Sequence, residues 1–187
     1  MILYQTVEDR DNPEHIELNA PFICDRTDAW LGEGYYFWDT LIDNAHWWGK
    51  TVYKQKGHVV LKFLCDSINE RCFDLYGNLE HLKYFNEIAD FFKNEEVVDN
   101  STTVSMIIEF LKENASLDDK YDGIRVYGHN SKSRHKTIKM LFRQGRNSNQ
   151  YLELAPPVQL CLFRKNSFNL QPGIIVYPSH YVSGTVV

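Results

Sequence analysis

The sequence predicts an α+β fold, a mixed or antiparallel β-sheet with its helices in the first two-thirds of the chain. Apolar and polar residues alternate as in strands at the start of the chain and through its last third. Two long segments with helical spacing lie between these parts. No Pro-rich or Gly/Ser-rich tract divides the 187 residues, so a single domain over 1–187 is expected. Helices grouped in sequence, rather than alternating with strands, are typical of α+β proteins.

The first part of the chain predicts strands around one helix. The opening MILYQTV alternates as a strand, an irregular segment follows to about Ala29, and GYYFWD predicts a second strand. Asp39 or Thr40 can cap a helix over TLIDNAHWW, which Gly49 is expected to end. GHVVLKFLCD is the clearest strand because most of its residues are apolar, and RCFDLYG is expected to continue the same sheet.

The spacing of the apolar residues then becomes helical. Leu79 to Lys93 carries apolar residues three and four positions apart, which predicts a helix. STTVSMIIEFLKEN begins with a Ser/Thr cap and predicts a second helix to about Asn114. After Asp122 the chain returns to strands, at GIRVY, TIKMLFR, YLEL, PVQLCLF and GIIVYP.

The charge of the chain is unevenly distributed. The net charge is −5, yet no Asp or Glu occurs from Gly123 to Leu152. That stretch contains seven basic residues, which leaves −12 on the rest of the chain: Arg125, Lys132, Arg134, Lys136, Lys139, Arg143 and Arg146. Such an asymmetry favours a basic face that meets nucleic acid or another polyanion. The alternative interpretation is a solvated loop around GHNSKSRHK.

Several classes of protein are not indicated. No run of about 18 apolar residues occurs, so no membrane span is expected, and the N-terminus lacks the pattern of a signal peptide. The four cysteines show no CxxC pairing, and the simplest interpretation is reduced thiols in a cytoplasmic protein: Cys24, Cys65, Cys72 and Cys161. The seven histidines form no metal-binding motif, so no metal site is expected.

The stretch WLGEGYYFWDTLIDNAHWW, residues 30–48, is unusually aromatic. On a strand followed by a helix, Thr40, Asn44 and Trp47 share one helical stripe, and Leu41, Ala45 and Trp48 form a neighbouring stripe that is expected to face the core. A flat ring could stack on Trp47 and bond to Asn44. The competing interpretation is that Trp47 belongs to the core.

LYQT at residues 3–6, followed by LGEGYYFWDTLIDNAHWW, resembles the ADP-ribosyltransferase superfamily, most closely its diphtheria-toxin and poly-ADP-ribose-polymerase branch. That branch opens with a strand like LYHGS and continues with a pattern like GKGIYFADxxxxSANY. The matching positions are Gly32, Gly34, Tyr36, Phe37 and Ala45, and Trp47 stands where the family has its second stacking aromatic. The resemblance covers both ends of the chain but not residues 66–120. It implies a mixed, split β-sheet.

The resemblance also implies that NAD is the substrate. It places the ring of NAD's nicotinamide between Tyr36 and Trp47, with Asn44 bonding the nicotinamide amide. Gln5 and the Thr6 backbone would hold the nicotinamide and ribose end. Gly34 would allow a close approach of the backbone. Gln159 would contact the ribose.

Two of the three signature residues of the branch differ here. The family pattern is His, Tyr and Glu, whereas this sequence has Gln5, Tyr36 and Gln159. A carboxylate stabilises the positive charge that develops on the ribose, and losing one such group often costs about 100- to 1000-fold in rate. Some members work as mono-transferases without the Glu. Carboxylates near in sequence that could replace it are Glu33, Asp39 and Glu153.

Three functions therefore remain open at the level of sequence. The first is mono-ADP-ribosylation of an unidentified acceptor, in a bacterial or phage-related toxin or defence role that the family implies. The second is a degenerate transferase fold kept for protein contacts or for binding NAD without turnover. The third is a nucleic-acid-binding module, in which the basic stretch contacts phosphates and Tyr127 or Phe142 stacks on bases.

Overall fold

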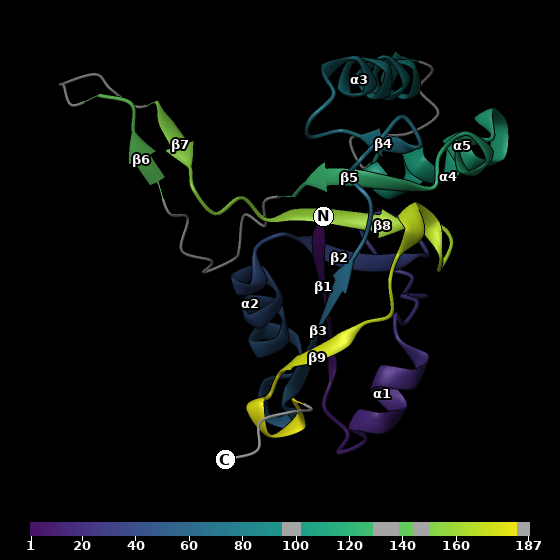
Figure 1. Cartoon of the computed structure of the whole chain (residues 1–187). Coiled ribbons are helices and arrows are strands. Elements are labelled where there is room, and N and C mark those ends of the chain that lie inside the picture. Colours follow the sequence, from purple (N-terminus) through teal and green to yellow (C-terminus); the bar gives the residue numbers. More distant parts are fainter. Residues whose placement is uncertain (95–101, 129–138, 144–149, 183–187) are drawn as a thin grey trace.

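The computed structural model describes residues 1–94, 102–128, 139–143 and 150–182. Its centre is a seven-stranded sheet in the order β4-β5-β8-β2-β1-β3-β9 (Figure 1). The strands are β1 (Ile2–Glu8), β2 (Tyr35–Asp39), β3 (His58–Leu64), β4 (Cys72–Asp74), β5 (Gly123–Tyr127), β8 (Val158–Leu162) and β9 (Ile174–Tyr177). A separate ribbon joins β6 (Lys139–Leu141) to β7 (Tyr151–Glu153) (Figure 1).

The sheet is mixed, which confirms the predicted α+β class. β4 and β5 run parallel, and the other neighbouring strands run antiparallel. Within the residues that the structure describes, the α-helices precede β5: α1 (Pro13–Asn19), α2 (Ile42–Val52), α3 (Leu79–Asn94), α4 (Val104–Ala115) and α5 (Leu117–Lys120). Three short 3₁₀ turns complete the described structure: η1 (Lys54–Lys56), η2 (Ser167–Asn169) and η3 (Ser179–Tyr181). None of the helices in the described residues is both long and apolar enough to cross a membrane.

Helix α1 corrects the expectation of an irregular segment up to Ala29. It spans seven residues and buries only Ile16, so it leaves almost no periodic signal in the sequence. Its N-cap, Asn12, makes no side-chain capping bond, although a proline stands in the first turn. Contact between Ile16 and the sheet stabilises this helix more than any local signal does.

Helix α2 differs from its predicted bounds at both ends. It begins after Leu41, and it continues through Gly49 to Val52. A Cβ at position 49 would lie 2.3 Å from the His58 ring, so glycine is required there by a close approach to β3 and not by the end of a helix.

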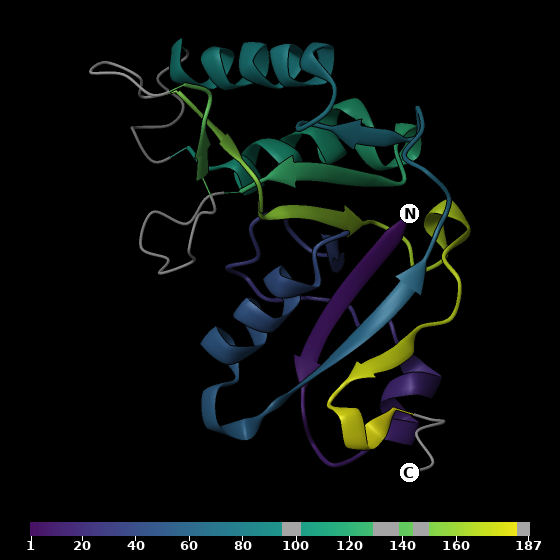
Figure 2. The same cartoon turned by 60° about the vertical axis from the view of Figure 1, so that its left-hand side comes forward.

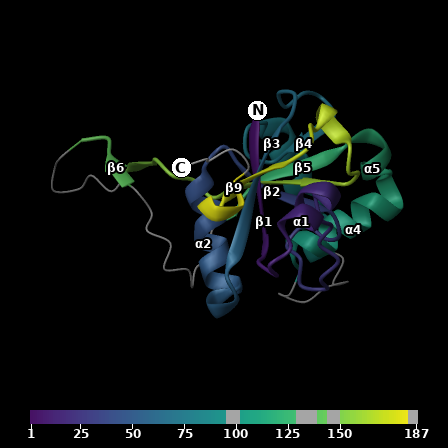
Figure 3. The same cartoon turned by 60° about the horizontal axis from the view of Figure 1, so that its bottom comes forward.

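The helices form layers on the two faces of the sheet (Figure 3). Helix α1 packs on one face with Leu3 and Phe37, whereas α2 packs on the other with Trp38 and Val60. Helices α3 and α4 cover the end of the sheet formed by β4 and β5 (Figure 2). The three resulting clusters bury most of the large apolar side chains of the strands.

The two central strands separate along their length. β1 pairs with β3 from Ile2 to Glu8, but with β2 only at Leu3 and Tyr4. Beyond Tyr4, the edge of β1 that faces β2 pairs with no strand in the described part of the chain. The sheet therefore opens between Gln5 and Tyr36, and this opening positions the candidate site.

Candidate functional site

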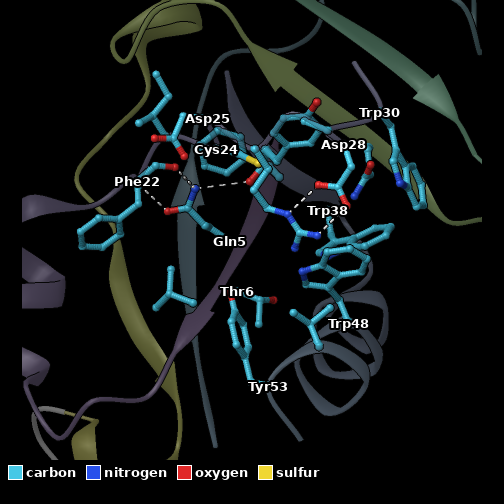
Figure 4. Close-up of a pocket in the computed structure, with 18 of the residues that line it drawn as sticks. Gln5, Thr6, Phe22, Cys24, Asp25, Asp28, Trp30, Trp38, Trp48 and Tyr53 are labelled. Atoms are coloured by element: carbon cyan, nitrogen blue, oxygen red, sulfur yellow. Dashed lines mark hydrogen bonds and ion pairs between the residues drawn. The ribbon is translucent and has the colours of Figure 1, made fainter. Parts of the chain in front are cut away.

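A pocket of about 470 Å³ lies where β1 and β2 separate (Figure 4). Its volume lies in the range of small-molecule sites, roughly 300–1,000 Å³. The lining residues come from β1, β2, the C-terminal half of α2, β8 and the segment before β2: Gln5, Thr6, Val7, Arg10, Phe22, Ile23, Cys24, Asp25, Arg26, Asp28, Ala29, Trp30, Tyr36, Phe37, Trp38, Trp48, Val52, Tyr53 and Gln159.

One wall of the pocket is aromatic. Trp38 on β2 and Trp48 on α2 lie against each other with ring centroids 6.2 Å apart, and Trp30 meets Trp48 edge-on at 6.2 Å. Figure 4 shows Trp38 and Trp48 on one side of the pocket and Gln5 and Phe22 on the other. Indole rings that pack on one another are held rigidly, so this wall is suited to stacking on a flat ligand ring.

Gln5 lines the pocket, and its side-chain amide bonds to the protein backbone. Oε1 accepts from the Phe22 N–H at 2.7 Å, and Nε2 donates to the Phe22 carbonyl at 2.9 Å. Nε2 also lies 3.4 Å from the Tyr36 carbonyl. The side chain is buried, so these bonds fasten the segment after α1 to the sheet. In this structure the amide positions the backbone of Phe22, and its contact with the nicotinamide and ribose end of NAD stays a prediction.

Tyr36 lines the pocket too, and its hydroxyl is also engaged by the backbone. It donates to the Gly32 carbonyl at 2.7 Å and accepts from the Leu31 N–H at 2.8 Å. Burial raises the pKa of the Tyr36 phenol, so the hydroxyl stays protonated. The group available to a ligand is therefore the ring and not an ionised oxygen.

Gln159 occupies the centre of β8 and pairs with Trp38 on β2 and Val126 on β5. Its side chain is only 6 % exposed, and Oε1 has no hydrogen-bond partner in the described structure. A buried acceptor without a partner costs about 1–3 kcal/mol. Rotation of the terminal amide exchanges its oxygen and nitrogen, so either atom can meet a ligand in the pocket.

Thr6 joins the same lining from β1. Its hydroxyl donates to the Ala45 carbonyl at 3.0 Å and so ties β1 to α2. Its backbone lies on the part of β1 that has separated from β2. The predicted backbone contact at Thr6 is therefore open to a ligand that approaches from the β2 side.

Three other predicted ligand residues lie away from the described lining. Asn44 is fully buried and donates from Nδ2 to the Pro156 carbonyl at 3.2 Å. Trp47 packs edge-on against Trp38, with centroids 6.1 Å apart. At Gly34 a Cβ would lie 2.5 Å from the Cys161 sulfur, so this glycine serves strand packing.

The stripe assignment on α2 explains the difference between Trp47 and Trp48. Ala45, Trp48 and Val52 are three and four positions apart and lie on one side of the helix. The same side faces the sheet at Ala45 and the pocket at Trp48 and Val52. The side of α2 that packs on the sheet thus continues into the pocket wall, whereas Trp47 lies on the neighbouring side of the helix, outside the described lining.

The carboxylates considered as replacements for a family Glu do not line the pocket. Asp39 is buried and binds Arg125, with the Arg125 Nε 2.8 Å from Asp39 Oδ2. Glu33 and Glu153 are also missing from the described lining. The carboxylates that do line it are Asp25 and Asp28.

The basic stretch is only partly described. Arg125 bonds two carboxylates, Asp39 and Asp74, and its side chain is only 17 % exposed, so it does not belong to an open basic face. Lys139 lies over the Tyr151 ring at 4.1 Å, and Arg143 follows β6. Outside the described residues are Lys132, Arg134, Lys136 and Arg146.

The cysteines are free thiols, and those in the sheet are buried. Burial raises the pKa of Cys72 and of Cys161 to about 12. Thiols of that kind are protonated near neutral pH, so a cysteine nucleophile on β4 or β8 is not supported. Among the described residues no group of three metal-binding side chains occurs.

Comparison with known proteins adds no further guide. No protein-family model matches the sequence, and neither a curated protein nor a solved structure matches it. The geometry of the pocket and the resemblance seen in the sequence are the observations on which function can be argued.

The sequence did not single out the segment from Phe22 to Asp28 as part of the site. It supplies much of the lining, yet it has no periodic pattern. The backbone bridge of Cys24 to Gly34 and the bonds from Gln5 hold it in place. The only local signal is its position just before the aromatic stretch.

Proposed function

We propose that this protein is an ADP-ribosyltransferase-like protein that binds NAD in the pocket between β1 and β2 and transfers its ADP-ribose to an acceptor. The observation that carries the proposal is the meeting of Gln5, Tyr36 and Gln159. They come from three different strands, correspond to the three signature positions of the resemblance, and line one pocket.

The chemistry of the lining fits the nicotinamide end of NAD. The pyridine ring is flat and can stack on Trp48 or Trp38, and stacking of a base on an aromatic side chain is worth about 1–3 kcal/mol. Its carboxamide can bond the unpaired backbone edge of β1 at Thr6. The buried amide of Gln159 can then bond a ribose hydroxyl.

The proposed reaction breaks the bond between nicotinamide and the ribose C1. Nicotinamide leaves with the electron pair of that bond, C1 becomes an oxocarbenium ion, and the acceptor attacks C1 and loses a proton. A neutral amide at position 159 orients the ribose but supplies no negative charge. Turnover should therefore be about 100- to 1000-fold slower than with a carboxylate at that place. The activity that we propose is mono-ADP-ribosylation of an acceptor, in a toxin or defence role.

The neighbouring tryptophans of α2 provide a matched test. Calorimetry should detect NAD binding, and a nicotinamide-release assay should detect slow turnover. Trp48→Ala should weaken NAD by about 1–3 kcal/mol because it removes a pocket wall. Trp47→Ala should affect the melting temperature more than NAD affinity, because Trp47 packs on Trp38 outside the lining. No NAD affinity in the wild type, or equal losses of affinity in both variants, would refute the assignment.

One observation favours the second candidate, an NAD-binding protein without turnover. The hydroxyl of Tyr36 and the amide of Gln5 are both bonded to backbone, and position 159 carries no charge. Binding of NAD with no nicotinamide release over many hours would select this alternative.

A further inference from the structure

Two arginines line the pocket in addition to its aromatic wall. Arg10 follows β1, and Arg26 belongs to the segment that Gln5 fastens to the sheet. They are brought to one pocket from separate parts of the chain. The resemblance assigned no role to either, and both remain accessible, with side chains 72 % and 56 % exposed.

Each guanidinium is oriented by a carboxylate that binds one side of it. Arg10 donates from Nε and Nη2 to Glu8 at 3.1 and 2.8 Å. Arg26 donates from Nε and Nη2 to Asp28 at 2.8 and 2.7 Å. In the described structure, Nη1 of both arginines makes no bond to the protein, so each retains N–H donors for a further acceptor.

Tyr53 lines the same pocket as the two arginines, near the end of α2 (Figure 4). Burial raises the pKa of the Tyr53 phenol, so its hydroxyl stays protonated and can donate a hydrogen bond. Two guanidinium groups and a phenol hydroxyl thus line one aromatic pocket.

We propose that Arg10, Arg26 and Tyr53 form a phosphate-binding subsite, so that the ligand of this pocket is a phosphorylated nucleotide. Its flat ring lies on the tryptophan wall, and its phosphate accepts N–H bonds from the arginines. The inference rests on the proposed function in placing the ligand in the same pocket, and it adds the group by which that ligand is selected.

The surrounding charges decide how such a subsite works. Glu8 is shared by Arg10 and Lys56, with Lys56 at 2.7 Å, which leaves one positive charge in excess there. Asp25, also in the lining, offsets that excess, and Asp28 balances Arg26. Recognition therefore depends on directed guanidinium bonds rather than on net charge. Exposed arginine–carboxylate pairs contribute only about 0–1 kcal/mol, so a phosphate can compete for these donors.

The test compares ligands that differ by a phosphate. Calorimetry is performed with nicotinamide riboside against nicotinamide mononucleotide, and with adenosine against ADP, beside NAD. Arg10→Gln and Arg26→Gln should each weaken the phosphorylated member of a pair by about 10- to 100-fold and leave the unphosphorylated member unchanged. Arg164→Gln is the matched control, since Arg164 is equally exposed and ion-paired but lies at a different surface.

The outcomes separate this inference from the proposed function. If NAD binds and both variants bind it like the wild type, the subsite is wrong and the proposed function stands. If ADP binds in an arginine-dependent way while NAD and nicotinamide mononucleotide do not bind, the subsite stands and the proposed function is wrong. Absence of binding by every phosphorylated probe overturns the subsite. Arg10→Lys and Arg26→Lys retain the positive charge but lose the planar guanidinium that makes paired hydrogen bonds. Their affinity for the phosphorylated ligands should therefore lie between those of the Gln variants and the wild type.

Discussion

Replacing Gln5 with Leu tests whether this amide holds the pocket together. The substitution keeps the side chain's volume roughly constant and removes its hydrogen bonds to Phe22, 2.7 and 2.9 Å long, and the longer contact to the Tyr36 carbonyl. Each good bond contributes about 0.5–1.5 kcal/mol, and the Phe22 backbone groups lose their partner in a part-buried place. We therefore expect the free energy of unfolding to fall by about 2–4 kcal/mol.

The assay is thermal or urea unfolding followed by circular dichroism. For a chain of this size, about 1 kcal/mol corresponds to roughly 2–4 °C, so the melting temperature should fall by roughly 4–16 °C. NAD affinity should fall in addition, because Phe22 and the segment after it line the pocket. The matched control is Gln171→Leu, which removes an exposed amide bonded to the Asn169 carbonyl and should cost less than about 0.5 kcal/mol.

A loss under about 0.5 kcal/mol for Gln5→Leu would refute the reasoning. It would mean that the segment from Phe22 to Asp28 is held by its own packing and by the bridge of Cys24 to Gly34. An unchanged stability with a strong loss of NAD affinity would instead indicate that Gln5 contacts the ligand directly, as the sequence predicted.

Three further changes test other parts of the structure. Gln159→Glu should raise nicotinamide release about tenfold or more, because it puts a carboxylate beside the developing oxocarbenium. Burial of the new carboxyl should raise its pKa in the folded state. The variant's loss of stability should therefore grow as pH rises above about 4.3. An unchanged rate in a folded variant would argue against a ribose contact. Arg125→Leu should lower the free energy of unfolding by about 3–5 kcal/mol because it leaves two buried carboxylates unpaired, and a cost under about 1 kcal/mol in urea unfolding would contradict this. Burial lowers the pKa of His46 and of His58, whose rings are 3.2 Å apart at Nδ1 and Nε2. Their neutral forms are favoured in the folded state, so stability should be complete above about pH 6.5 and should decline as pH falls below it. His58→Gln should flatten that decline between pH 7.5 and 5 in unfolding measurements, whereas His180→Gln should not.

The sequence by itself determined most of the elements. The alternation in β1, the apolar runs of β3 and β8 and the helical spacing in α3 and α4 are local patterns, so the sequence shows them without the tertiary structure. The same reasoning placed Gln5, Tyr36 and Gln159 on strands. It missed α1, where a single buried residue creates no period.

Tertiary structure decided which residues meet in the pocket. The choice of Trp48 over Trp47 depends on how α2 is rotated against β1, and one position along a helix turns a side chain by about 100°. The contacts that fixed Gly34 and Gly49 lie on other elements, at Cys161 of β8 and His58 of β3, so neither glycine's role is visible in its own local pattern.

The segment from Phe22 to Asp28 shows the same division most clearly. Nothing in its own residues specifies its path, because it has neither a helical nor a strand period. Its position is set by an amide on β1, 17 residues before Phe22, and by a bridge to Gly34. Such long-range hydrogen bonds form only once the sheet has assembled, so the lining that carries Asp25 and Arg26 could not be predicted from local sequence.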